Sequence, residues 1–132
     1  VNTFSNDYNE EFCDWVSLVA ITPGEVSLYF KYGMDFINYV NLVIDNIAEV
    51  EPANAFKSSK KLAFKNEEDK YDVTLFWNTF CMILTERMKE NPLKYARGVE
   101  VTAPYIDKSM KPGTNLQQLY DSWVFKIREA WL

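Results

Sequence analysis

The segment Tyr71–Met88 reads YDVTLFWNTFCMILTERM and holds the densest run of large apolar side chains in the chain. Its main apolar stripe recurs at a spacing of three or four residues, the period of an α-helix, and consists of Val73, Phe76, Trp77, Phe80, Ile83, Leu84 and Met88. Leu75 and Met82 widen the apolar surface to more than half of the circumference. A helix of this kind is normally buried among neighbours. We therefore expect this segment to be the central helix of the fold.

The charges around this segment predict where the central helix begins and ends. Asn66 precedes three acidic residues, 67–69, and acidic side chains are favoured in the first turn of a helix. Arg87 and Lys89 suit the last turn, and Pro92 follows as a stop signal. The sequence thus predicts a helix from Asn66 to the residues just before Pro92.

Three further long amphipathic helices are predicted by the same spacing. The first runs from about Tyr8 to Ala20, the second from a cap at Asp35 to near Val50, and the third from a capping box of Thr114 and Gln117 to the C-terminus. The packing partners expected for the central helix are the second and third of these. Thr22-Pro23-Gly24-Glu25 opens a short helix that ends at Gly33, although residues 26–32 also alternate as a strand does.

Residues 92–113 give the weakest pattern. Pro92 can start a short helix that Gly98 stops, Val99–Thr102 can form a brief strand, and a further helical turn can follow at Pro104. The whole pattern predicts an all-α protein. We expect a compact single-domain bundle over residues 1–132, with about four long amphipathic helices plus one or two short ones.

The composition argues against most catalytic chemistry. The chain has no histidine, and its two cysteines, Cys13 and Cys81, lie among apolar residues and are expected to be free, buried thiols. Histidine-dependent nucleophile systems and tetrahedral zinc sites are therefore excluded within this chain, and the four glycines form no phosphate loop. Paired carboxylates occur only in predicted first turns of helices, where capping explains them. We expect no enzyme activity, no cofactor and no metal; a carboxylate-based enzyme is the third-ranked alternative.

Charge is distributed unevenly along the chain, whose net charge is −5. Residues 1–56 carry nine acids and one base, and residues 57–132 carry ten acids and thirteen bases, which gives −8 and +3. Such polarity favours head-to-tail association or an anionic partner, unless the two halves interleave on folding.

The connector before the central helix is the strongest basic segment. Lys57, Lys60, Lys61 and Lys65 alternate there with Phe56, Leu62 and Phe64. Together with Arg97, these lysines could contact phosphates while the rings stack on bases. This gives the rival hypothesis of a nucleic-acid-binding coat or nucleocapsid-type packaging protein. The alternative is an ordinary solvated connector whose rings anchor it to the core.

The leading hypothesis is a non-catalytic helical interaction or structural protein whose partner is another protein or the chain itself. Aromatic residues make up 16% of the chain, more than a core of this size needs. Trp131 and Leu132, at the chain end, are candidate protein-binding residues unless they dock on the core. No small-molecule substrate is indicated. No apolar run reaches membrane-spanning length, so we expect no membrane partner and an intracellular, cytoplasmic location.

Overall fold

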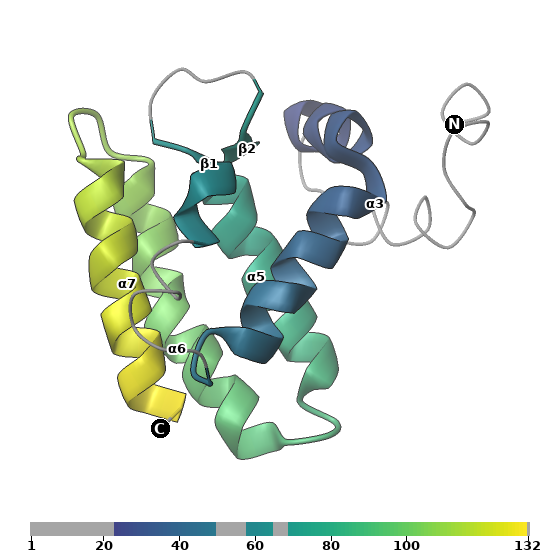
Figure 1. Cartoon of the computed structure of the whole chain (residues 1–132), viewed down its shortest axis with the longest axis vertical. Helices are drawn as coiled ribbons and strands as arrows, with labels where there is room; N and C mark the ends of the chain where they lie inside the picture. Colours follow the sequence, from purple (N-terminus) through teal and green to yellow (C-terminus); the bar gives the residue numbers. More distant parts are fainter. Residues whose placement is uncertain (1–22, 50–57, 65–68, 132) are drawn as a thin grey trace. The chain divides into compact units, whose positions relative to one another are not determined.

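The computed structural model describes residues 23–49, 58–64 and 69–131 (Figure 1). The chain divides into two compact units, residues 1–39 and 40–132. The described elements are α3 (Pro23–Asn46), the 3₁₀ helix η1 (Ser58–Lys61), β1 (Leu62–Ala63), β2 (Tyr71–Asp72), α5 (Val73–Arg87), α6 (Pro92–Ser109) and α7 (Leu116–Trp131). The predicted all-α fold is confirmed. The single domain over 1–132 stays a prediction, and the predicted helix from Tyr8 to Ala20 lies outside the described residues.

Helix α3 begins in the first unit and is broken at Gly33, which has φ 69° and ψ −162°. Glycine adopts such angles without the steric cost that a Cβ brings. The helical interpretation of residues 26–32 and its end at Gly33 are confirmed, and the helix resumes directly afterwards. Within this unit Phe36 is buried against the rings of Tyr29 and Tyr32, at centroid distances of 6.2 and 5.2 Å.

Helix α5 is the predicted central helix, but its predicted start is wrong. It begins at Val73, where the carboxylate of Asp72 accepts a hydrogen bond of 2.8 Å from the backbone N–H of Leu75. Residues 69–72 are not helical, and within them Tyr71 and Asp72 pair in parallel with Leu62 and Ala63. The helix ends at Arg87, as the basic residues there predict.

Helix α6 corrects the prediction for residues 92–109. A single helix runs through Gly98 and Pro104, so neither the stop at Gly98 nor the strand at Val99–Thr102 exists. Gly98 lies inside this helix, and tertiary packing explains why the residue there has no side chain. An added Cβ would lie 2.6 Å from Leu84 and 2.7 Å from Trp131. Close packing therefore explains this glycine, which the sequence alone suggests is a helix end.

Helix α7 has the predicted apolar stripe but a different cap. Asn115 accepts the backbone N–H of Gln118 through its side-chain oxygen, at 3.1 Å. The hydroxyl of Thr114 instead donates to the carbonyls of Lys108 and Lys111 in the preceding turn. The predicted capping box of Thr114 and Gln117 is therefore wrong. Thr114 is bonded to the end of α6 and the turn that follows it, and the neighbouring Asn115 caps α7.

The core of the second unit is aromatic. Helices α5, α6 and α7 lie side by side (Figure 1), and their fully or almost fully buried rings are Phe76, Trp77, Phe80, Tyr105, Tyr120 and Trp123. Centroid distances between α5 and α7 rings run from 5.0 Å (Phe80–Trp123) to 6.4 Å (Trp77–Tyr120). These side chains are the apolar stripes that the sequence predicts for the two helices.

The last turns of α3 belong to the second unit and attach to α5 through polar contacts. The guanidinium of Arg87 donates to Asp45 and to Asn41, each at 2.6 Å. Arg128 of α7 donates to the backbone carbonyl of Ile47, just after α3. These polar contacts agree with the expected packing by the helix that follows Asp35, and ring contacts of Phe76 and Phe80 with Trp123 confirm the packing by the C-terminal helix. The extensive packing of α5 against α6 was not predicted.

Candidate interaction surface on helices α6 and α7

Helices α6 and α7 run antiparallel, and a ladder of side-chain hydrogen bonds sets their register. The indole N–H of Trp131 donates to the carbonyl of Lys94, and that of Trp123 donates to the hydroxyl of Thr102, both at 2.9 Å. Tyr105 and Ser122 share a further hydrogen bond of 2.9 Å between their hydroxyls. Residues later in α6 therefore bond to residues earlier in α7, as expected for antiparallel helices.

At Gly98 the ring of Trp131 lies against the bare backbone of α6. This ring also stacks on Phe80, with centroids 6.0 Å apart, and the ammonium of Lys94 lies 5.1 Å from its centre. Trp131 is therefore half-buried and docked on α6, the alternative that the sequence left open. A protein-binding role for Trp131 stays a prediction, and Leu132 lies outside the described residues.

On the outer side of this helix pair lies a groove of about 320 Å³. Its lining comes from one turn and a half of each helix: Arg97, Glu100 and Val101 from α6, and Lys126, Glu129 and Ala130 from α7. Val101 and Ala130 are half-buried, whereas the four charged side chains are exposed. The groove thus has an apolar floor and a rim with two cations and two anions.

The four rim charges make no hydrogen bond or ion pair with the parts of the chain that the structure describes. Their placement still follows a pattern. Arg97 and Glu100 are three residues apart on α6, as are Lys126 and Glu129 on α7, so each helix presents one cation and one anion on a single face. Since the helices are antiparallel, Arg97 lies at the level of Glu129 and Glu100 at the level of Lys126. The net charge of the rim is zero.

Exposed apolar side chains extend this surface at both ends. Phe125, four residues before Glu129, is 66% exposed, and Leu93, four residues before Arg97, is 75% exposed. A spacing of four residues places two side chains on the same face of a helix. Large apolar side chains next to a groove are the usual chemistry of a protein-binding surface.

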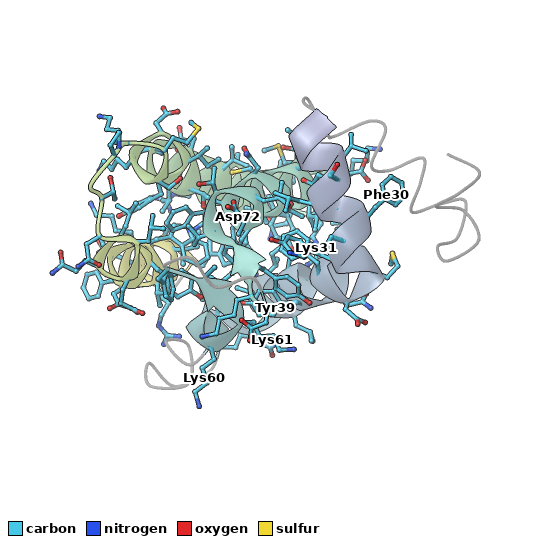
Figure 2. The ribbon with its side chains drawn as sticks, turned by 90° about the horizontal axis from the view of Figure 1, so that it is seen from above. Phe30, Lys31, Tyr39, Lys60, Lys61 and Asp72 are labelled. Atoms are coloured by element: carbon cyan, nitrogen blue, oxygen red, sulfur yellow. The ribbon has the colours of Figure 1, made fainter. Side chains whose placement is uncertain are left out.

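Of the predicted nucleic-acid-binding residues, the structure describes Lys60, Lys61 and Arg97. Lys60 and Lys61 are exposed on η1, where Figure 2 labels them, and they are not among the residues that line the groove. Arg97 instead lies beside two glutamates. Lys57 and Lys65 are outside the described residues. The nucleic-acid hypothesis stays a prediction.

Cys81 is free and buried on α5, as predicted. Burial raises the pKa of its thiol to about 12, because the surroundings disfavour the thiolate. The nucleophilic form is therefore scarce at neutral pH. The other cysteine, Cys13, lies outside the described residues.

Sequence reasoning did not find the groove. The signal was present as opposite charges at i and i+3 in both Arg97/Glu100 and Lys126/Glu129. It was hidden because the sequence predicts a helix end at Gly98, which separates Arg97 from Glu100 in the predicted elements. Only an unbroken α6 places these two side chains on one face.

No family model, no curated protein and no solved structure matches this chain. In the described residues no helix combines the length and the apolar character that crossing a membrane requires. Within the same residues no group of three or more acidic, cysteine or histidine side chains is placed to hold a metal ion.

Proposed function

We propose that this chain is a non-catalytic helical interaction protein that binds a protein surface through the outer face of α6 and α7. The observation that carries the proposal is the groove of about 320 Å³ together with the exposed side chains beside it, Phe125 and Leu93. Protein-binding surfaces combine a small apolar centre with a polar rim, and aromatic anchors contribute most of their binding energy.

The state of the rim charges supports the same proposal. Exposed charged side chains that form no ion pair within the molecule are available to pair with charges on a partner. Complementary charges between two proteins set the register and the rate of their association. A rim with no net charge favours a partner that offers both signs. Phosphate backbones offer only negative charge, and for this reason the groove favours a protein.

Site-specific photo-crosslinking in cells tests the proposal. A photoreactive amino acid replaces Phe125 in the full chain, and the matched control carries it at Met110, which is 61% exposed at the end of α6 and does not line the groove. The expected result is intermolecular crosslinks from position 125, well above those from position 110. Equal or absent crosslinking at the two positions would overturn the proposed function.

A further inference from the structure

We propose that the partner of this surface is a second copy of the chain, and that Phe125 of each copy packs against α6 of the other, beside its groove. This inference rests on the proposed function and names the occupant of its site. Three observations carry it: the space in the groove, the position of Phe125 outside that groove, and the order of the rim charges.

The groove offers space and some apolar surface at the centre of such an interface. Its volume is about 320 Å³. Val101 and Ala130 give an apolar floor, while Arg97 and Lys126 lie at the rim. A cation such as Arg97 on α6 attracts the face of an aromatic ring that the partner presents.

Phe125 is adjacent to the groove but does not line it. It is two residues from the buried Trp123 and two from the buried Ile127, so it points away from the core and leaves 66% of its surface exposed. A two-fold interface requires that the same patch carry both the protruding group and the surface that receives it. The outer face of α6 and α7 meets this requirement, with the ring and the groove side by side.

The charges around the groove are self-complementary. Arg97 and Glu129 lie at one level of the helix pair, and Glu100 and Lys126 lie at the next. A two-fold axis parallel to the helices places α6 of one copy over α7 of the other. Each cation then faces an anion of the partner: Arg97 meets Glu129, and Lys126 meets Glu100. Against a partner surface of a single sign, two of the four rim charges would instead face a charge of their own sign.

A charge-swap experiment on the full chain tests this pairing. The double variant R97E/K126E makes the rim entirely acidic, and the double variant E100K/E129K makes it entirely basic. Sedimentation equilibrium is measured for each variant alone and for an equimolar mixture at low salt. The control is K89E/K111E, which removes two exposed cations outside the groove and changes the net charge as much as R97E/K126E does.

We expect the wild-type chain and the control to pair, with a dissociation constant that rises with salt. Each groove variant alone should weaken pairing by roughly tenfold or more, because like charges then face each other. The mixture should restore pairing between one acidic and one basic copy. Circular dichroism and thermal unfolding establish that all variants are folded.

Self-pairing is overturned if the wild-type chain stays a monomer at every concentration, if the groove variants pair as well as the control does, or if the mixture of folded variants stays monomeric. The crosslinking from position 125 separates this failure from failure of the proposed function. A crosslink to a different protein leaves the proposed function standing and removes self-pairing, whereas no crosslink removes both.

Discussion

The inner and outer faces of helices α6 and α7 use the same residue types in opposite ways. On the inner face Trp123 is fully buried, its indole N–H donates to Thr102, and its ring contacts those of Phe76 and Phe80. On the outer face, two residues along the same helix, Phe125 is 66% exposed. On the inner face Trp123 and Tyr105 form hydrogen bonds within the molecule, while the four rim charges of the outer face have no partner in the described residues.

This difference shows what the aromatic excess in the sequence means. Many of the rings gather in the core of the second unit, which agrees with the ordinary packing explanation. A smaller part of the excess lies outside the core, with Phe125 as its clearest member. The two explanations that the sequence left open therefore apply to different faces of one helix pair, and only the outer face offers a surface for a partner.

The largest expected effect separates the two neighbouring aromatics. Trp123→Ala should lower the free energy of unfolding by about 3–5 kcal/mol, because it removes a fully buried indole and leaves a cavity. Phe125→Ala should change it by less than about 0.5 kcal/mol, since the ring is exposed. Urea unfolding at a concentration that keeps the chain monomeric measures both. Equal destabilisation by the two changes would break the comparison between the faces.

The next effect tests the close approach that unites the helices. Gly98→Ala should destabilise the protein by about 1–2 kcal/mol, because overpacking against Leu84 and Trp131 outweighs the better helix propensity of alanine. Ala96→Gly serves as a control for propensity alone on the same helix. A stabilised Gly98→Ala protein with an unchanged tryptophan emission spectrum would contradict the packing described for Trp131.

Helix existence was predictable from the sequence, and helix boundaries were less so. The stripes of α5 and α7 were found because buried apolar residues repeat at the helical period, and Gly33 marked a true break. The helix starts predicted at Asn66 and Thr114 were wrong because local capping signals compete with tertiary contacts. In the folded chain Asp72 caps α5 and Asn115 caps α7. Gly98 misled for a similar reason, since the approach of Trp131 from α7 is invisible within α6.

The candidate surface was not predicted as a whole, for a related reason. The groove depends on the antiparallel register of α6 and α7, which sets Glu129 beside Arg97 across 32 positions of sequence. That register is fixed by contacts such as Trp123 with Thr102 and not by any local pattern. The basic connector stood out in the sequence because its lysines are neighbours along the chain.

A smaller effect concerns the polar attachment of α3 to α5. Arg87→Ala should cost about 0.5–1 kcal/mol, because the ion pair with Asp45 is partly solvated and the hydrogen bond to Asn41 is lost with it. Thermal unfolding at low and high salt measures the change, and the wild-type advantage should shrink as salt rises. A loss as large as that of Trp123→Ala would show that this attachment belongs to the core.

The smallest effect on the free energy of unfolding at neutral pH is expected from the titration of the Cys81 thiol. In a Cys13→Ser background the thiol should stay unmodified by a disulfide reagent at pH 8 and react fully in urea. Its raised pKa favours the protonated form in the folded state, so its contribution to stability is complete below pH 9.0 and is lost as pH rises towards 12. Rapid modification of the folded protein would show that Cys81 is not buried.

The central claim is that the outer face of α6 and α7 brings two copies together. Its most direct test is the concentration dependence of the native mass, measured by sedimentation at low salt for the wild-type chain, Phe125→Ser and the control Leu42→Ser, whose side chain is 60% exposed on α3. For the wild type and the control, the mass should rise from the 15.5 kDa of one chain towards twice that value, while Phe125→Ser should stay near the value for one chain. A wild-type mass that remains at one chain throughout, or a Phe125→Ser protein that pairs as the wild type does, would contradict the claim.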